Sequence, residues 1–119
     1  MFYVLVLGLS TPEINRPVFD LRGRFLGAPD LLDREAGLAL EFDGQGHRQR
    51  VQHRQDNVRE EGFEEAGLVV VRADSSDLTS HQTQLRRRVL SGRERGLARD
   101  RSRDAWTLEE PAYWLGMPA

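Results

Sequence analysis

The feature that most constrains the fold is a run of alternating side chains over residues 37–43. Every second residue is apolar, and the residues between them include Glu41 and Asp43. A period of two is the spacing of a β-strand, because successive side chains point to opposite faces of a sheet. We therefore predict a strand here, with an apolar face and with both carboxylates on the other face.

The residues before this strand predict its partner. An apolar run ends at Leu32, and a polar, glycine-ended turn follows at 34–37. If the segments on either side of the turn pair as a hairpin, Asp30 lies level with Glu41. Three carboxylates, those of Asp30, Glu41 and Asp43, then converge at one end of a sheet.

Carboxylates packed so closely repel one another, which makes the arrangement costly. A divalent cation removes that cost, and Mg²⁺ commonly takes one or two protein carboxylates together with phosphate oxygens. The spacing therefore indicates a Mg²⁺ or Mn²⁺ site for phosphate chemistry. An ordinary solvated strand face is the alternative, and composition alone favours it equally, since acidic residues are common on exposed strands.

Several short motifs follow one another in a fixed order. They are Pro29-Asp30, then after ten residues Glu41-Phe42-Asp43, then Gly44-Gln45-Gly46-His47, Asp56-Asn57-Val58-Arg59 and the largely apolar segment 66–72. This order resembles the PD-(D/E)XK nuclease signature, in the branch related to the very-short-patch repair (Vsr) endonuclease. The resemblance covers residues 8–90. It implies an α/β, restriction-endonuclease-like fold, in which a mixed β-sheet, built from a hairpin and a βαβ crossover, is flanked by helices.

The resemblance also implies a function and a set of roles. The chain is expected to be a metal-dependent DNA endonuclease that hydrolyses phosphodiester bonds with Mg²⁺ or Mn²⁺. Asp30 and Glu41 are the implied metal ligands. Asp43 is either a third ligand or a residue that orients a water or His47. The His47 imidazole is suited to proton transfer to or from water and the leaving oxygen.

Three further residues complete the predicted site. The resemblance implies that Asp56 orients His47, and that Arg59 and Arg48 contact the phosphates of the DNA. The alternatives are that His47 is simply exposed to solvent and that Asp56 and Arg59 form an ion pair one helical turn apart, worth a few tenths of a kcal/mol.

One position departs from the family pattern. The lysine of the third motif is replaced by Asp43, and the chain contains no lysine at all. Catalysis through that lysine is therefore excluded. This keeps a second interpretation open, in which the chain is a non-catalytic DNA-binding or regulatory module with a nuclease-like fold.

The rest of the chain predicts further elements. Segments 16–21 and 24–32 are predicted strands joined by a turn at Gly23. Residues 48–66 are a predicted helix and 68–71 a buried, central strand of parallel orientation. Residues 79–91 form a second predicted helix.

Glycines and apolar spacing refine these helices. On the first helix, Val58, Gly62 and Ala66 share a face with Val51, and we expect Gly62 to lie in close contact with the sheet. Gly92 is expected to end the second helix. Residues 1–9 are apolar and favour a helix through the resemblance, although their composition favours a strand.

Composition bounds the remaining possibilities. The chain has 119 residues, no cysteine and a net charge of −2, which fits one compact unit without disulfides. No apolar run approaches the ~20 residues of a membrane span, so we expect a cytoplasmic protein that does not bind membranes. The predicted endonuclease-like domain covers residues 1–95, and residues 96–119 form an extension that is partly docked or disordered.

Two expectations concern partners. The family resemblance makes an upstream DNA-binding module a possible companion of this chain. The extension carries two tryptophans and a tyrosine, namely Trp106, Tyr113 and Trp114. A disordered tail rarely holds such residues, so they are expected either to dock on the body of the protein or to form a homodimer contact. If they form a homodimer contact, the chain is a structural or assembly domain.

Overall fold

The structure is a computed structural model that describes residues 11–43 and 50–116. The predictions for residues 1–9, His47 and Arg48 lie outside these ranges. The side chains of 50–56, and with them that of Asp56, also lie outside the description. No helix within the described ranges combines the length and apolar character needed to cross a membrane.

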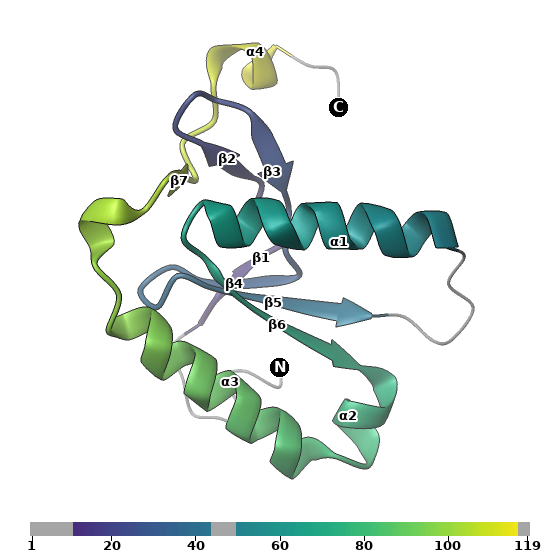
Figure 1. Ribbon diagram of the computed structural model, residues 1–119. Helices are drawn as coiled ribbons and strands as arrows, with labels where there is room; N and C mark the ends of the chain where they lie inside the picture. Colours follow the sequence, from purple (N-terminus) through teal and green to yellow (C-terminus); the bar gives the residue numbers. More distant parts are fainter. Residues whose placement is uncertain (1–10, 44–49, 117–119) are drawn as a thin grey trace.

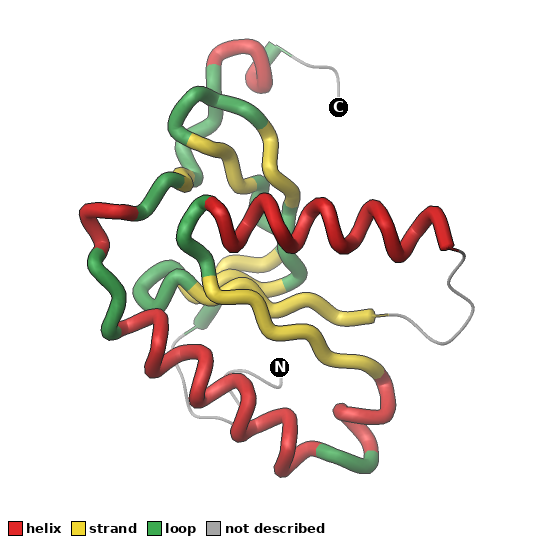
Figure 2. The backbone as a smooth tube through the Cα atoms, in the orientation of Figure 1, coloured by secondary structure: helices red, strands yellow, loops and turns green. Residues whose placement is uncertain are grey.

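The chain forms a mixed α/β structure with two sheets (Figure 1). Its elements are β1 (Glu13–Ile14), β2 (Val18–Asp20), β3 (Phe25–Gly27), β4 (Leu31–Asp33), β5 (Leu38–Asp43), α1 (Arg50–Glu65), β6 (Val69–Asp74), α2 (Ser75–Thr79), α3 (Gln82–Leu97), η2 (Arg101–Arg103), β7 (Trp106–Thr107) and α4 (Ala112–Leu115). The larger sheet has the order β1-β4-β5-β6, and the smaller has the order β3-β2-β7. Helices α1 and α3 lie on opposite sides of the larger sheet, as the tube in Figure 2 shows.

The predicted hairpin and crossover are both present. Strands β4 and β5 are antiparallel, with Leu31 opposite Leu40. Strands β5 and β6 are parallel, with Glu41 opposite Arg72. The helix between β5 and β6 supplies the long connection that parallel strands need. The larger sheet is therefore mixed, as the sequence predicted.

Strand alternation divides the core into two layers. Leu38, Leu40 and Val71 pack with Leu85 and Val89 of α3 on one face of the sheet. The opposite face packs against α1 through a separate cluster, whose buried members are Val18, Leu32, Ala39, Phe63, Leu68 and Leu108. The side chains between the α3-facing residues of β5 therefore point toward α1.

Helix α1 buries only part of the predicted face. Phe63 is fully buried and Ala66 nearly so, whereas Val58 is 69% exposed. A Cβ added at Gly62 would meet only the Leu26 side chain, at 3.9 Å, so the expected tight contact with the sheet is absent. The reason is that the bulky Phe63, not the small residues, fills the space over the sheet.

Strand β6 is the edge strand of the described sheet, so its predicted central position is wrong. Its apolar sequence has another cause. Val70 packs in the α1-facing layer, while Val69 and Val71 pack in the α3-facing layer. Helices cover both faces of this edge strand, and that coverage produces the same sequence pattern as a central position.

The predicted strand 24–32 divides into β3 and β4, which belong to different sheets. The break occurs at Gly27, whose φ is +148°, and at Pro29, which has no N–H to donate. A Cβ at Gly27 would lie 2.8 Å from side-chain atoms of Arg59 and Phe63. The chain therefore changes sheets where α1 crosses over its backbone.

Helix α3 continues past Gly92 to Leu97, so the predicted end at Gly92 is wrong. Gly92 and Gly96 are both buried inside the helix. A Cβ at Gly92 would lie 3.0 Å from Val71 and 3.2 Å from Leu38. These glycines let the helix approach the sheet and the β4–β5 turn closely, which explains their presence in a helix that they would otherwise weaken.

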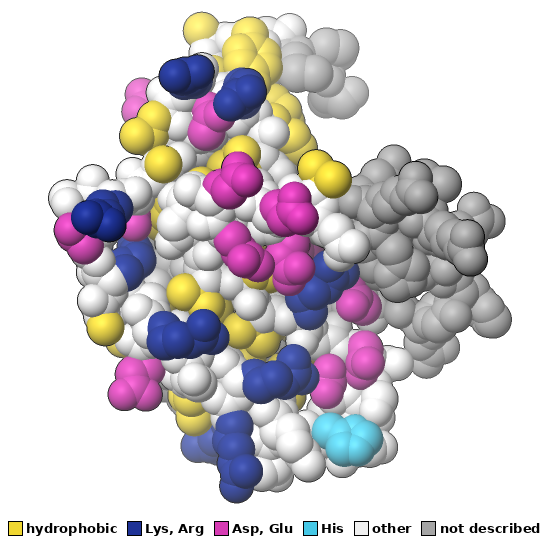
Figure 3. Space-filling view, viewed as in Figure 1, with side chains coloured by type: hydrophobic (Ala, Val, Ile, Leu, Met, Phe, Trp, Pro, Cys, Tyr) yellow, Lys and Arg dark blue, Asp and Glu magenta, His cyan; other side chains and the backbone are white. Residues whose placement is uncertain are grey.

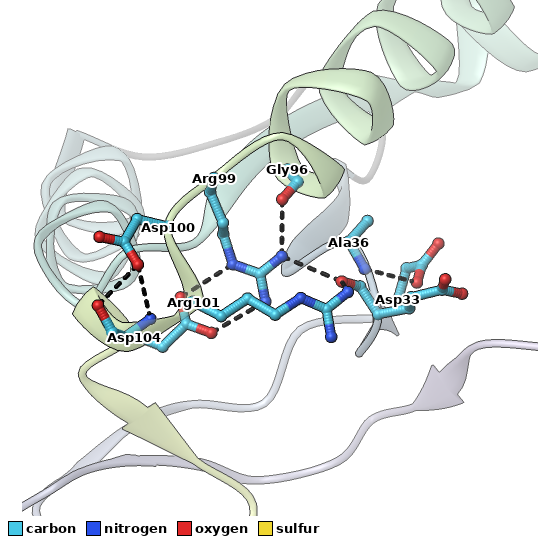
Figure 4. Close-up of polar contacts among 9 residues, drawn as sticks. Asp33, Ala36, Gly96, Arg99, Asp100, Arg101 and Asp104 are labelled. Atoms are coloured by element: carbon cyan, nitrogen blue, oxygen red, sulfur yellow. Dashed lines mark hydrogen bonds and ion pairs between the residues drawn. The ribbon is translucent and has the colours of Figure 1, made fainter.

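The segment after α3 is ordered by an arginine (Figure 4). The Arg99 guanidinium donates two hydrogen bonds of 2.9 Å to the Asp104 carboxylate. It also donates to the backbone oxygens of Gly96, at 2.7 Å, and of Glu35, at 3.0 Å. Because Glu35 lies in the β4–β5 turn, this arginine ties the C-terminal segment to the larger sheet.

A buried carboxylate supports the same turn. Asp33 is 5% exposed; it accepts a hydrogen bond of 3.1 Å from the Ala36 N–H and pairs with Arg93 of α3 at 3.0 Å. Burying a carboxylate is tolerated when it is paired and hydrogen-bonded, as here. The turn is therefore held from α3.

The C-terminal residues complete the smaller sheet. Strand β7 pairs with β2, and Leu108 is 6% exposed in the α1-facing core. The Trp114 ring lies 5.1 Å from the Phe19 ring and 5.0 Å from the Phe25 ring. Docking within the same chain thus occupies Trp114, and residue 96, the predicted boundary, lies within α3.

We expect Trp114→Ala to lower the free energy of unfolding by about 2 kcal/mol, because a half-buried ring loses its contacts with Phe19 and Phe25. Urea unfolding followed by Trp106 fluorescence measures this change, and sedimentation measures the mass of the assembly. Unchanged stability with loss of a dimer would instead assign Trp114 to an intermolecular contact.

Candidate functional site

Asp30, Glu41 and Asp43 lie on one side of the larger sheet. Extending the β4–β5 register by one residue beyond Leu31 and Leu40 places Asp30 opposite Glu41. Glu41 and Asp43 alternate with the α3-facing residues of β5, so they share the α1-facing side with Asp30. The structure therefore brings the predicted carboxylates to the same end and the same face of the sheet.

A backbone hydrogen bond positions Asp30. Its Oδ2 atom accepts a hydrogen bond of 2.7 Å from the N–H of Phe42 on β5. This bond crosses from the segment before β4 to the end of β5. It holds the Asp30 carboxylate against the backbone of β5 at the residue that follows Glu41.

Glu41 is the most unusual acid of this group. It is 7% exposed, and its Oε2 atom is hydrogen-bonded and ion-paired with Arg59 of α1. Within the part of the chain that the structure describes, its Oε1 atom is buried and accepts no hydrogen bond. A buried acceptor without a partner costs about 1–3 kcal/mol, so this atom is available to a ligand.

Burial raises the pKa of Glu41 above its ordinary value. The positive charge of Arg59 opposes this effect, and the negative charge of Asp30 adds to the rise in the pKa of Glu41. The register of β4 and β5 places Asp30 opposite Glu41, which accounts for this effect of its charge. A cation placed between them would stabilise both ionised forms and reverse the shift.

Asp43 has a different environment. Its Oδ1 atom lies 2.6 Å from the Arg72 guanidinium, which comes from the neighbouring strand β6. Hydrogen bonding to Asp43 raises the pKa of Arg72, so the arginine remains charged. The sequence left open whether Asp43 is a ligand or an orienting residue, and the structure places it in this ion pair.

The arginines and acids enclose a small pocket of about 10 Å³, which is the size of roughly one water molecule. Its lining residues are Glu41, Arg59, Glu60 and Arg72. Arg72 and Glu60 are not among the site residues predicted from the sequence. Arg72 could have been found, because a parallel crossover from 37–43 to the next strand places the end of that strand beside Glu41.

The acidic side chains of the site can be compared with the ligands that the expected metal ion needs. No group of three or more histidine and acidic side chains arranged to hold a metal occurs among the residues described here. Asp30 and Glu41 nevertheless provide two interacting carboxylates, and Glu41 offers an unpaired oxygen. This donor set fits Mg²⁺, which takes one or two carboxylates and completes its shell with water and phosphate oxygens.

Comparison of the chain with protein-family models, curated proteins and solved structures finds no match. The geometry of the site therefore carries the functional argument.

Proposed function

We propose that this protein is a metal-dependent DNA endonuclease with a restriction-endonuclease-like fold, related to the PD-(D/E)XK nucleases and their Vsr branch. The observation that carries the proposal is the buried, unpaired oxygen of Glu41 beside Asp30. A buried polar atom without a hydrogen-bond partner calls for an explanation, and a bound ligand would supply one.

In this proposal, Asp30 and Glu41 hold Mg²⁺ or Mn²⁺ at the end of β5. The ion, when bound, would polarise the phosphate and lower the pKa of a bound water. The Phe42 N–H holds Asp30 in place, and Arg59 keeps Glu41 oriented through its Oε2 atom. In this proposal His47 transfers the proton, Asp56 orients His47, and Arg48 contacts the substrate.

The two arginines at the pocket take over a charge role that a lysine would otherwise have. Arg59 and Arg72 both line the pocket beside Glu41. A guanidinium does not deprotonate near neutral pH, so these side chains stabilise negative charge on the phosphate but do not transfer protons. This division of roles accounts for a site without lysine.

A supercoiled-plasmid assay tests the proposal. We expect conversion to the nicked or linear form with Mg²⁺ or Mn²⁺ and none with EDTA. In calorimetry, we expect Asp30→Asn to weaken Mn²⁺ binding by about 10- to 100-fold, because one carboxylate is lost. Asp100→Asn, at an exposed carboxylate in the segment after α3, is the matched control and should bind Mn²⁺ as wild type does. Equal Mn²⁺ affinity in both variants would contradict the metal site.

A second candidate function is a non-catalytic DNA-binding module. The observation that favours it is that Arg59 pairs with Glu41 and Arg72 pairs with Asp43, so two acids are neutralised without a metal. The plasmid assay separates the two functions. A binding module would retain DNA without nicking it, and its affinity would not respond to Mn²⁺.

A further inference from the structure

A groove of about 400 Å³ runs between α3 and the edge strand β6. Its polar lining consists of Arg72, Arg87, Arg88, Ser91 and Arg95, which we call the basic groove. Arg87, Ser91 and Arg95 are spaced four residues apart, so they lie in one row along the helix. The row is about 12 Å long, from a rise of 1.5 Å per residue.

Two of these arginines are already paired, and two are not. Arg72 pairs with Asp43, and Arg88 lies 3.0 Å from Asp77 of α2. Neither Arg87 nor Arg95 has an acidic partner within salt-bridge distance in the described ranges 11–43 and 57–116. Both are exposed, so their charges are available to an anion.

Charge is segregated between the two long helices. Helix α3 carries five arginines and one glutamate, a net charge of +4. The described side chains of α1, residues 57–65, include four glutamates and one arginine, a net charge of −3. In Figure 3 a group of acidic side chains lies over α1, and several basic side chains lie over α3 and the neighbouring edge of the sheet. The chain as a whole has a net charge of only −2, so this asymmetry is local.

The basic groove and the candidate site have one residue in common. Arg72 lines both the basic groove and the small pocket that contains Glu41. A polyanion that follows the groove is therefore led to the pocket from the α3 side, while the acids of α1 repel it from the other side. Arg87 and Arg95 lie about 12 Å apart along α3, far enough to contact different phosphates of one DNA strand.

We propose that the basic groove binds the phosphate backbone of duplex DNA next to the candidate site. This inference rests on the proposed function for the identity of the polyanion. Arg87 and Arg95 make the phosphate contacts, Ser91 lies between them as a hydrogen-bond donor, and Arg72 joins the groove to the pocket. Such contacts position the duplex without reading its sequence.

The test is fluorescence anisotropy of a labelled 20-base-pair DNA duplex in EDTA, titrated over a range of salt concentrations. The variant is Arg87→Gln/Arg95→Gln. Its control, Arg22→Gln/Arg86→Gln, removes the same charge from the β2–β3 turn and from a position on α3 outside the groove. We expect the groove variant to bind at least about tenfold more weakly and its salt slope to fall by about 2, as for two lost phosphate contacts. The control keeps the wild-type slope.

The outcomes separate this inference from the proposed function. No duplex binding by the wild type, or equal losses in both variants, would overturn the groove. Binding of an RNA duplex that depends on Arg87 and Arg95, with DNA binding that does not, would also overturn it. A groove-dependent salt slope in a protein that never nicks plasmid supports the groove and rejects the nuclease. If the protein nicks plasmid but its DNA affinity does not depend on Arg87 and Arg95, the nuclease function is supported and the groove is rejected.

Discussion

Gly96→Ala is expected to lower the free energy of unfolding by at least about 3 kcal/mol, because the added methyl group has no space. A Cβ at this position would lie 1.8 Å from the carbonyl oxygen of Ala36. Both atoms belong to or adjoin the backbone, so neither can rotate away. Relief requires α3 to move off the β4–β5 turn, which would break the hydrogen bond from Arg99 to Glu35 and the ion pair between Arg93 and Asp33.

Urea unfolding measures this loss, and two other glycines calibrate it. Gly62→Ala, where the added Cβ meets only Leu26 at 3.9 Å, should stabilise the protein by about 0.5–1 kcal/mol through helix propensity. In Gly92→Ala the added Cβ would lie 3.0 Å from a side-chain atom of Val71, which can shift slightly. The stability of this variant should therefore fall between those of the Gly96 and Gly62 variants. Equal stabilities of the Gly96 and Gly62 variants would contradict the close contact between α3 and the turn.

Glu41→Gln is expected to reduce metal-dependent DNA cleavage by at least about 100-fold, because it removes a proposed ligand charge while preserving shape. The same variant should show a second, independent effect in metal-free buffer. Burial raises the pKa of Glu41, so the folded chain holds this proton more tightly than the unfolded chain does. The stability contributed by the protonated form is present below the unfolded pKa and is lost as the pH rises through the folded pKa.

The stability of Glu41→Gln relative to wild type should therefore increase between pH 4 and pH 7, because only the wild type must ionise a buried acid. Urea unfolding at both pH values in EDTA measures the difference. Glu109→Gln, at an exposed glutamate, is the control and should show no such trend. A trend of the opposite sign would mean that Arg59 dominates the environment of Glu41 and lowers its pKa.

A stability cost at Glu41 together with a loss of function on its removal would mark this residue as part of a site. Functional sites commonly retain groups that the fold alone would disfavour. If Glu41→Gln stabilised the protein and DNA binding remained intact, without cleavage by the wild type, the binding-module function would be favoured instead.

The strand 37–43, its hairpin and the parallel crossover were readable from the sequence. Alternation, a glycine-ended turn and helical spacing are properties of residues that are close along the chain. The hairpin register then follows from the turn, and with it the position of Asp30 opposite Glu41. The carboxylates of the candidate site were therefore predictable as a group on one face.

The partner of Glu41 was not predictable, although the parallel crossover could have placed Arg72 near the end of β5. Arg59 reaches Glu41 from a helix, and Arg72 reaches Asp43 from a neighbouring strand. Whether Arg59 meets Glu41 depends on how α1 packs over the sheet, and that packing joins segments that are distant in the chain. The same holds for Gly92, which local rules assign to a helix end and which the structure uses as a contact.

Local sequence patterns predicted the strand over 37–43, the helix before the next strand, the register of the β4–β5 hairpin, and the common face of Asp30, Glu41 and Asp43. Packing between distant segments placed β6 at the edge of the described sheet, docked Trp114 within its own chain, and set the acidic α1 and the basic α3 on opposite faces of the larger sheet. The two kinds of feature depend on interactions of different range along the chain. Periodicity and turn chemistry act between neighbours in the chain, whereas burial and ion pairing depend on segments that meet only when the whole core is packed.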